Sequence, residues 1–337
     1  MNKKFLAGMA VILLLVGIFG FTTVSQAKTM RVALVLSGGM GDRSFLDSAY
    51  RGLTWAEEKL DIKTRYIEPK GPEEYQPSIR AMAQAGYDLI ITIAFGMLDA
   101  TNTIADQFPN TNFAIVDAVS DRPNVASLVF KEHVGSYLVG VIAGKMTKTN
   151  TIGFVGGMEI PLIKRFELGF IEGVKAVNPT AKILSGYAGA FDDPGKGKEL
   201  GLSQYKREAD IVYHAAGKTG EGVIEAAKEV DRYVIGVDSD QCHIAPDHML
   251  ASMMKMVDVA VFNTIQDLVN GDFKPGLKVY GLEENAIGPC HLYPDLLDLS
   301  EHKDFPGLDE AIKAAEEYRD KILAGEIEVP DAMEMDL

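Results

Sequence analysis

Phenylalanine, aspartate and glycine residues gather in the short loops that follow apolar segments of the chain. These loops are 37–42, 94–96, 117–118, 156–159, 189–193, 216–217 and 238–241. Aromatic rings can stack on a flat heterocycle, carboxylates can accept hydrogen bonds from its N–H and O–H groups, and glycines let it approach the backbone. A phosphate would instead favour a basic or amide-lined site. The loops therefore predict a binding site for a flat heterocyclic ligand.

Common catalytic motifs do not accompany these loops. The G-x-S-x-G elbow, the phosphate-binding P-loop and the H-E-x-x-H zinc motif are all absent from the sequence. Asp42, Asp238 and Asp240 could form a metal or acid–base cluster in a nucleoside hydrolase, but they lie on different motifs with Lys255 nearby. Binding without catalysis and without a cofactor is the favoured interpretation. An enzyme, or a sensor that reports ligand occupancy to a membrane receptor, is the alternative.

Apolar segments of strand length alternate with helical patterns from residue 30 onward. Strands are predicted at 30–37, 64–68, 88–93, 112–117, 125–130, 151–156, 182–188, 210–215, 232–238 and 278–282. Helices are predicted at 44–60, 73–86, 98–108, 132–147, 161–177, 194–208, 220–230, 256–270 and 307–324. Short strands that are wholly apolar are typical of parallel sheets buried on both faces. The alternation predicts doubly wound α/β sheets, which bind ligands at the carboxyl ends of their strands.

Two strand–turn–helix units of similar pattern lie about half a chain apart, at 30–53 and 151–174. This repetition predicts two similar lobes with a cleft between them.

Local signals mark two of the helix starts. Ser44 can cap the helix that follows it, and Asp193 can cap the helix that begins at Pro194.

Residues 1–27 have the pattern of a cleaved signal peptide. Lys3 and Lys4 precede an apolar run at 5–21, and small residues lead to a cleavage point after Ala27. A single membrane anchor is the alternative, but no cationic stop-transfer cluster follows the apolar run. No cysteine lies near the cleavage point, so lipid attachment is not expected. We therefore expect a protein that is free in an extracytoplasmic compartment, the periplasm, with no direct membrane anchoring.

Acidic residues dominate the charge of the chain, which is −15 at pH 7. Without the two lysines of the signal peptide, the charge becomes still more negative. Such a chain repels nucleic acid and anionic lipid, and no run of basic residues opposes this, so no nucleic-acid partner is expected. After residue 30, no apolar run is long enough to span a membrane.

The two cysteines, Cys242 and Cys290, leave three possibilities open. A disulfide is one, because the expected compartment is oxidising. Two unpaired thiols are another. Each cysteine is followed by a histidine, His243 and His291, so a Cys/His metal site is the third, although the spacing matches no familiar zinc pattern.

Several longer motifs resemble one known family. They are GDRSF (41–45), EHVGSYLVGVIAG (132–144), IGFVGGMEIPLIKRFELGF (152–170), AAGKTGEGVIEAA (215–227), GVDSDQ (236–241) and SMMKMVD (252–258). In this order the chain resembles the basic membrane protein (BMP) family of ABC-transporter substrate-binding proteins, of the purine nucleoside receptor type. The resemblance extends from about residue 30 to 300 and implies a small-molecule ligand, a separate membrane permease as partner, and a monomer.

The resemblance also implies the type I periplasmic-binding-protein fold, in which two parallel-sheet lobes are joined by a three-strand hinge. Lobe one would hold residues 30–130 plus 240–280, and lobe two would hold 131–239 plus 283–337. The crossings between the lobes are expected near 130–131, 237–239 and 281–285.

Base recognition is the first role that the resemblance assigns to individual residues. Phe45 of GDRSF and Phe191 of GAFDD match the two rings that sandwich the base in nucleoside-binding members. Asp117 matches a carboxylate that accepts a hydrogen bond from the base edge. Each stacked ring is expected to contribute about 1–3 kcal/mol, by analogy with base stacking in proteins that bind nucleic acids.

Sugar recognition is the second role. Asp238 of GVDSDQ and Lys255 of SMMK match the groups that bind the ribose hydroxyls, and a carboxylate beside an ammonium group can accept from and donate to a diol. The backbone of Gly217 would contact the same sugar. Asp42, in the first loop, is a further candidate ligand-binding residue.

Two residues depart from the family pattern in the first loop. Arg43 stands where members often have a second aspartate, and Leu46 stands where they often have asparagine. Arg43 adds a fixed cation that could clamp an anionic or carbonyl-rich ligand. A purine nucleoside is the first expectation for the ligand, and riboflavin or a free nucleobase is the alternative.

Overall fold

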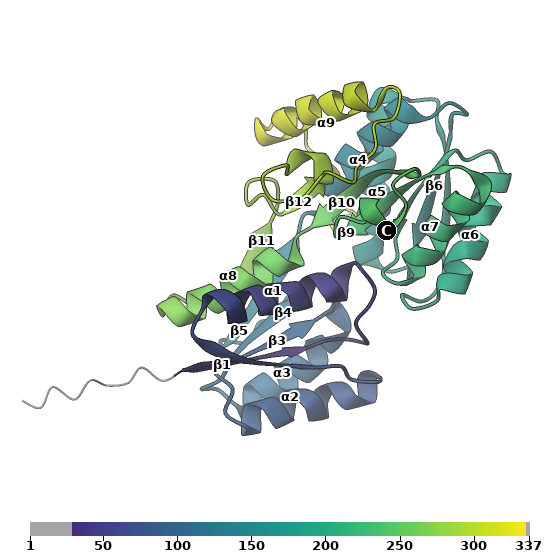
Figure 1. Ribbon diagram of the computed structural model, residues 1–337. Helices are drawn as coiled ribbons and strands as arrows, with labels where there is room; N and C mark the ends of the chain where they lie inside the picture. Colours follow the sequence, from purple (N-terminus) through teal and green to yellow (C-terminus); the bar gives the residue numbers. More distant parts are fainter. Residues whose placement is uncertain (1–28, 335–337) are drawn as a thin grey trace, which may run out of the picture.

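The computed structural model describes residues 29–334, and the expected signal peptide lies outside the described residues. Within this range the strands form two six-stranded sheets, each the centre of one lobe (Figure 1). Lobe one contains residues 30–130 and 257–280, and lobe two contains 131–256 and 281–334. The chain therefore passes between the lobes more than once, and each lobe is built from separate segments of sequence.

The sheet of lobe one is parallel throughout, in the order β2-β1-β3-β4-β5-β11. Its strands are β1 (Met30–Val35), β2 (Ile62–Ile67), β3 (Leu89–Ile93), β4 (Asn112–Val116), β5 (Val125–Phe130) and β11 (Gly276–Tyr280). Its helices are α1 (Phe45–Lys59), α2 (Tyr75–Gln84), α3 (Leu98–Gln107) and α8 (Val257–Asn270). Helices α1 and α8 cover one face, and α2 and α3 cover the other (Figure 1).

Strand β1 shows why these segments are apolar along their whole length. Side chains alternate between the faces of a strand. Val32 and Leu34 enter the core under α1, whereas Ala33 and Val35 enter the core under α2 and α3. Because helices cover both faces, both sets of side chains must be apolar, as the sequence predicted.

The sheet of lobe two follows the order β7-β6-β8-β9-β10-β12, and only β12 is antiparallel to its neighbour within the described chain. Its strands are β6 (Thr151–Gly156), β7 (Lys182–Tyr187), β8 (Ile211–Ala215), β9 (Tyr233–Asp238), β10 (Met249–Lys255) and β12 (Ile287–Pro289). Its helices are α4 (Glu132–Met146), α5 (Pro161–Val177), α6 (Pro194–Lys206), α7 (Thr219–Val230) and α9 (Leu308–Leu323). The first five strands repeat the order of lobe one, which confirms the predicted pair of similar lobes.

Strand β10 is the main element that the sequence analysis missed. Its seven residues, Met249–Lys255, are all buried, and it pairs with β9 on one side and β12 on the other. The segment MLASMMK contains no β-branched residue, so propensity gave little indication of a strand. The prediction that 240–280 as a whole belongs to lobe one is therefore wrong for β10, which lies in lobe two.

The chain crosses between the lobes after β5, after β10 and after β11 within the described residues. The expected crossings near 130–131 and 281–285 agree with this path. The crossing expected near 237–239 is wrong, because the chain first runs through β10 and leaves lobe two at Met256. The described residues contain no helix that is both long and apolar enough to cross a bilayer.

The two predicted helix caps have different outcomes. Asp193 does cap α6, since its Oδ1 accepts from the N–H of Lys196 at 2.9 Å. Ser44 precedes α1 but forms no cap with its hydroxyl. That hydroxyl instead donates to Asp238 in lobe two at 2.6 Å, so the cap prediction for Ser44 is wrong.

Candidate ligand-binding site

A cavity of about 590 Å³ lies between the two lobes. Lobe one lines it with the loops after β1, β3 and β4. Lobe two lines it with the loops after β6, β7 and β8 and with the ends of β9 and β10. The sequence had placed the site in the loops at the carboxyl ends of strands, and each of those loops supplies at least one lining residue. The volume is that of a site for a small organic ligand.

All seven predicted site residues line this cavity. They are Asp42, Phe45, Asp117, Phe191, Gly217, Asp238 and Lys255. The structure therefore brings together residues that are up to 213 positions apart in the sequence. Their roles toward a ligand stay a prediction. Met158 also lines the cavity, whereas Met97 is buried in the core of lobe one and Met40 packs against the core.

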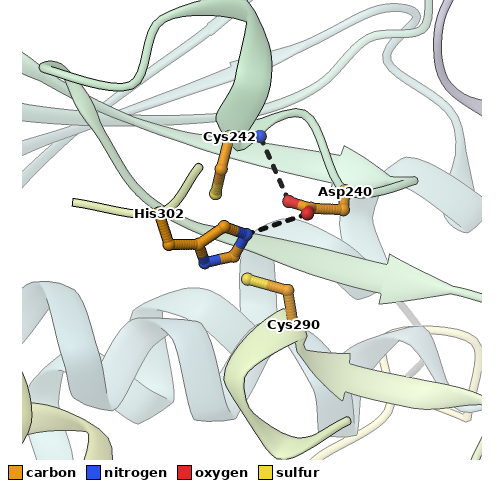
Figure 2. Close-up of side chains that lie close together, drawn as sticks. All are labelled: Asp240, Cys242, Cys290 and His302. Atoms are coloured by element: carbon orange, nitrogen blue, oxygen red, sulfur yellow. Dashed lines mark hydrogen bonds and ion pairs between the residues drawn. The ribbon is translucent and has the colours of Figure 1, made fainter. Parts of the chain in front are cut away.

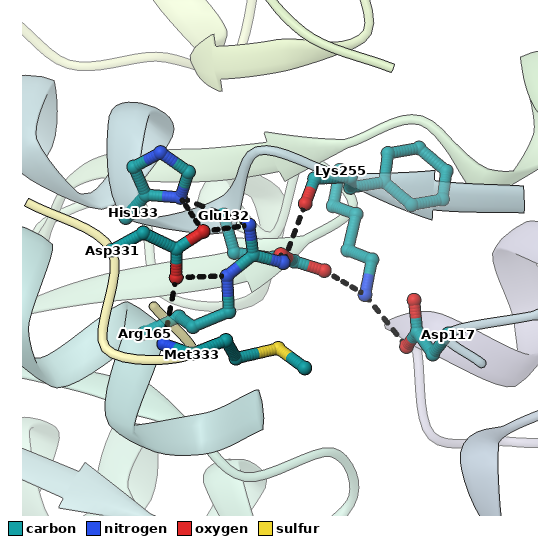
Figure 3. Close-up of polar contacts among 8 residues, drawn as sticks. Asp117, Glu132, His133, Arg165, Lys255, Asp331 and Met333 are labelled. Carbon is teal, nitrogen blue, oxygen red and sulfur yellow. Dashed lines mark hydrogen bonds and ion pairs between the residues drawn. The ribbon is translucent and has the colours of Figure 1, made fainter. Parts of the chain in front are cut away.

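Lys255 lies at the centre of a buried group of charges (Figure 3). Its Nζ is 2.7 Å from Oδ2 of Asp117 and 3.0 Å from Oε1 of Glu132. Both carboxylates are buried. Although burial lowers it, the pKa of Lys255 is raised above its ordinary value by Asp117, then Glu132, then Asp238. The sequence analysis had paired Lys255 with Asp238, but its direct ion pairs are with Asp117 and Glu132.

Arg165 continues this group of charges toward the C-terminal segment (Figure 3). Its guanidinium is 2.6 Å from Glu132 and 2.7 Å from Asp331, and it also donates to the carbonyl oxygen of Phe130 at 2.8 Å. Burial and the neighbouring Arg165 lower the pKa of His133 to about 4, so this imidazole is neutral at pH 7 and can accept from Arg165. Two buried cations thus share three carboxylates at the hinge.

The sequence analysis missed Glu132 and Arg165. Glu132 is an acidic residue in the first turn of a helix, a position where such residues commonly interact with the helix dipole on the surface. Arg165 lies on α5 and would ordinarily point to solvent. The largely apolar sequence of α4 was the only signal for Glu132. Several other charged residues lie on α5, so no pattern distinguished Arg165.

Asp117 and Asp238 occupy equivalent backbone positions in the two lobes. Asp117 directly follows β4, Asp238 ends β9, and both have φ of 65°. Burial raises the pKa of Asp117 to about 6 and that of Asp238 to about 7, in each case against the opposing charge of Lys255. Oδ1 of Asp117 is buried and has no hydrogen-bond partner among the described residues. A ligand N–H or O–H in the cavity could supply the missing donor.

Asp42 is already engaged with the protein backbone. Its carboxylate accepts from the N–H groups of Ser44, Leu46 and Asp47 at 2.9, 2.9 and 3.1 Å. It therefore provides the cap of α1 that the sequence analysis had assigned to Ser44. Burial raises its pKa, and these three donors oppose the rise. Asp42 lines the cavity mainly as the residue that fixes the start of α1, and hence the position of Phe45.

The two predicted stacking residues enter the cavity from opposite lobes. The ring of Phe45 lies 5.1 Å from Nζ of Lys255, a cation–π distance. The ring of Phe191 lies over Gly157, where any Cβ would collide with it. Gly217, with φ of 55°, adopts a left-handed conformation beside Phe191. Glycine at 157 thus makes room for the ring of Phe191, and glycine at 217 permits the left-handed backbone beside it.

Arg43 and Leu46, the two departures from the family pattern, have different surroundings. Leu46 lines the cavity. Arg43 is not among the lining residues; its side chain is 58% exposed and its Nε lies 3.7 Å from Glu221 of lobe two. The expectation that Arg43 clamps the ligand stays a prediction; the ion pair observed for its side chain is with Glu221 of the other lobe.

The chain matches the family model described as "ABC transporter substrate-binding protein PnrA-like" over residues 29–333. It is 40% identical over 330 residues to a CD4+ T-cell-stimulating antigen of Listeria monocytogenes, covering 91% of this chain and 89% of that protein. It is 36% identical over 290 residues to the ABC transporter nucleoside-binding protein BmpA of Lactococcus lactis, covering 79% of this chain and 83% of that protein.

Among solved structures, an ABC transporter solute-binding protein from Aeropyrum pernix superposes with a TM-score of 0.78. It is 27% identical in sequence, with coverage of 89% of this chain and 94% of the other. The match, together with the two doubly wound lobes, confirms the predicted type I periplasmic-binding-protein fold.

Proposed function

This chain belongs to the family of PnrA-like ABC transporter substrate-binding proteins, and on that premise we propose that it captures a nucleoside, first of all a purine nucleoside, in the cavity between its lobes. The observation that carries the proposal is the convergence of two aromatic rings, two buried aspartates and a buried lysine on one cavity. The similarity to a nucleoside-binding protein of Lactococcus lactis supports it.

The base would lie between Phe45 and Phe191, since these rings enter the cavity from opposite lobes. Asp117 would accept a hydrogen bond from the edge of the base through its unpartnered Oδ1. The arrangement uses the flat faces of the ligand for affinity and one N–H donor for orientation.

The sugar would lie near Asp238, Lys255 and the backbone of Gly217. Asp238 retains accepting capacity beyond its bond from Ser44, and ribose hydroxyls are suitable donors. A buried carboxylate without a cationic partner in direct contact gains from each additional donor. Asp238 is therefore the residue on which we expect ligand binding to depend most directly.

Ligand capture would close the lobes by bending at the three crossings. Two contacts already connect the lobes next to the cavity, Ser44 with Asp238 and Asp117 with Lys255. A ligand held between the lobes adds contacts that only the closed arrangement can make, so it shifts the population toward closure. The closed form would then deliver the nucleoside to a separate ABC permease for import.

The proposal includes a location outside the cytoplasm, in the periplasm, as a monomer without a membrane anchor. The pattern of residues 1–27 and the absence of a nearby cysteine support it. Cell fractionation and N-terminal sequencing of the native protein test it. A mature chain starting at Lys28 in the periplasmic fraction is the expected result, and retention of the N-terminal segment in the membrane fraction would contradict it.

A thermal-shift screen tests the proposed ligand. The purified protein is denatured and refolded to remove bound ligand, then mixed with purine and pyrimidine nucleosides, free bases, riboflavin and simple sugars. A ligand that binds only the folded protein raises Tm by mass action. We expect the largest rise with a purine nucleoside, and an intact nucleoside after prolonged incubation. A rise with riboflavin or free bases alone would overturn the nucleoside assignment, and release of a free base would indicate an enzyme.

A further inference from the structure

Four side chains able to bind a metal converge in lobe two, and none of them lines the cavity between the lobes. Asp240 and Cys242 follow β9, Cys290 follows β12, and His302 lies in the segment before α9 (Figure 2). One candidate ligand atom from each residue lies within 4.8 Å of the others. The cluster therefore joins the loop after β9 to two segments that follow β12.

The surroundings of this cluster are those of an ordered interior site. Both cysteines are buried, and the side chains of His302 and Asp240 are 10% and 17% exposed. Nε2 of His302 lies 2.8 Å from Oδ2 of Asp240, and both thiols point toward the imidazole (Figure 2). The backbone N–H of Ser252 donates to Sγ of Cys290 at 3.2 Å, as such groups commonly do to metal-bound sulfur.

One ring nitrogen of the cluster lacks a hydrogen-bond partner in the described chain. Nδ1 of His302 is buried and has no hydrogen-bond partner within residues 29–334. A buried ring nitrogen without a partner costs free energy, so such an atom commonly indicates an absent ligand, ion or water. Its other ring nitrogen, Nε2, is hydrogen-bonded to Asp240, and this hydrogen bond would be exchanged for metal bonds when both residues bind one ion.

We propose that Asp240, Cys242, Cys290 and His302 form a structural site for Zn²⁺ or a similar borderline-soft divalent cation. Thiolate, imidazole and carboxylate groups are the ligands that Zn²⁺ takes in tetrahedral sites. Bonds of about 2.3 Å to sulfur place two ligand sulfurs about 3.8 Å apart. The four ligand atoms lie within 4.8 Å of one another, so a small contraction of the cluster would suffice for one ion.

A metal accounts for more of the cluster than a disulfide does. A disulfide would consume the two sulfur atoms and leave Nδ1 of His302 without a partner. A bound cation would engage both thiols, releasing their two protons to solvent, and would also use the imidazole. The site would connect the loop after β9 to the C-terminal part of lobe two. This loop contains Asp240, which is two residues after Asp238. The proposal does not depend on which ligand occupies the cavity.

Titration of the purified protein with Co²⁺ tests the site. The protein is prepared under anaerobic conditions, reduced, and washed with a chelator that is then removed. We expect one Co²⁺ per chain, an absorption band from thiolate-to-cobalt charge transfer, and loss of the band when Zn²⁺ is added. We also expect Zn²⁺ alone to raise Tm.

Variants assign the ligands. Cys290→Ser should weaken the thiolate-to-cobalt band by the share of that thiolate. Asp240→Ala removes a proposed ligand and should weaken Zn²⁺ binding at least about tenfold in competition with a chromophoric chelator. His243→Ala is the matched control: His243 is exposed and follows Cys242 as His291 follows Cys290, and binding should be unchanged.

Three outcomes would overturn the proposal. One is binding below one metal ion per chain, with no thiolate band, in the folded wild-type protein. Another is an unchanged band in both Cys242→Ser and Cys290→Ser. The third is a native protein, isolated anaerobically, whose intact mass is lower by two hydrogens than that of the reduced protein, because it would show that the cysteines form a disulfide.

Discussion

Asp117 in lobe one and Asp238 in lobe two share one backbone position but have different partners. Both lie at the carboxyl ends of equivalent strands, with φ of 65°, and both are buried beside the cavity. Asp117 forms a direct ion pair with Lys255, whereas Asp238 is hydrogen-bonded to the neutral hydroxyl of Ser44. The repeated fold therefore supplies two carboxylates at one site, and the residues around them decide how each is used.

The difference separates a carboxylate whose charge is compensated by a direct ion pair from one that has no cation in direct contact among the described residues. Asp117 belongs to a network that continues through Lys255 and Glu132 to Arg165, so its negative charge is compensated within the protein. Asp238 has no cation in direct contact among the described residues, and burial raises its pKa to about 7. We infer that the network holds the hinge, and that Asp238 responds most to ligand and to pH.

Removal of the shared cation should have the largest effect. Lys255→Met leaves Asp117 buried without its cation and leaves Glu132 paired with Arg165 alone. Loss of one partner from a buried ion pair ordinarily costs about 3–5 kcal/mol. We expect a fall of this size in the free energy of unfolding, measured by urea denaturation without ligand. The double variant Lys255→Met with Asp117→Asn should recover part of the loss. A change below about 1 kcal/mol in the single variant would contradict the buried network.

Substitution of either aromatic ring should weaken binding, but only one of the two substitutions should also lower the stability of the ligand-free protein. Phe191→Ala is expected to weaken nucleoside binding by about 1–3 kcal/mol, the range for loss of one stacked base. Phe45→Ala should weaken binding to a similar degree and should also destabilise the ligand-free protein, because Phe45 contacts Lys255 and Phe191 does not carry such a contact in the described structure. Calorimetry gives the binding, and urea denaturation gives the stability.

Equal stability losses in both phenylalanine variants, without a change in binding, would mean that both rings serve only the core. Phe170→Leu provides a control for core packing. Its ring is fully buried in lobe two and is not among the lining residues of the cavity. It should lower stability while leaving the affinity for the nucleoside nearly unchanged.

The pH dependence of stability should distinguish the two aspartates. A carboxyl group whose pKa is higher in the folded state than in the unfolded state stabilises the protein at low pH, and this contribution is lost as pH rises through the folded pKa. The pH range over which this contribution is lost is about 4 to 6 for Asp117 and about 4 to 7 for Asp238. Between pH 6 and 7, Asp238 should therefore account for a decline of at most about 1.4 kcal/mol per pH unit.

Asp238→Asn removes this titration while keeping the shape of the side chain. Relative to the wild type, the ligand-free variant should gain stability as pH rises from about 6 to 7, and it should bind the nucleoside more weakly. Thermal unfolding in a series of buffers provides the measurement, and Asp117→Asn is the comparison. Parallel stability curves for wild type and Asp238→Asn across this window would show that Asp238 does not titrate there.

Sequence patterns predicted the lobes because helices cover both faces of each sheet, which requires apolar strands. They predicted the cavity residues through loops at strand ends and through the family motifs. They did not predict the pairing of charges, since Lys255 reaches Asp117 across 138 positions of sequence. The two lobes had to be in place before the partner of Lys255 could be identified. For the same reason, no sequence pattern indicated that the hydroxyl of Ser44, next to α1, donates across the cleft to Asp238.

The contact of Arg43 with the other lobe could not be predicted from the sequence either, and substitution of Arg43 should have the smallest effect on ligand affinity. From the sequence it was a candidate ligand clamp, but it lies outside the cavity lining and pairs with Glu221 at 3.7 Å across the lobes. With a side chain that is 58% exposed, it should contribute about 0–1 kcal/mol to closure. Arg43→Gln should therefore lower nucleoside affinity by less than about tenfold, and the loss should shrink as salt is added.

Glu221→Gln should have the same effect, and the double variant should add nothing further if the two side chains act only as a pair. Because the pair closes the lobes without touching the ligand, every nucleoside should be affected equally; a loss specific to one ligand would mean that Arg43 reads the ligand itself.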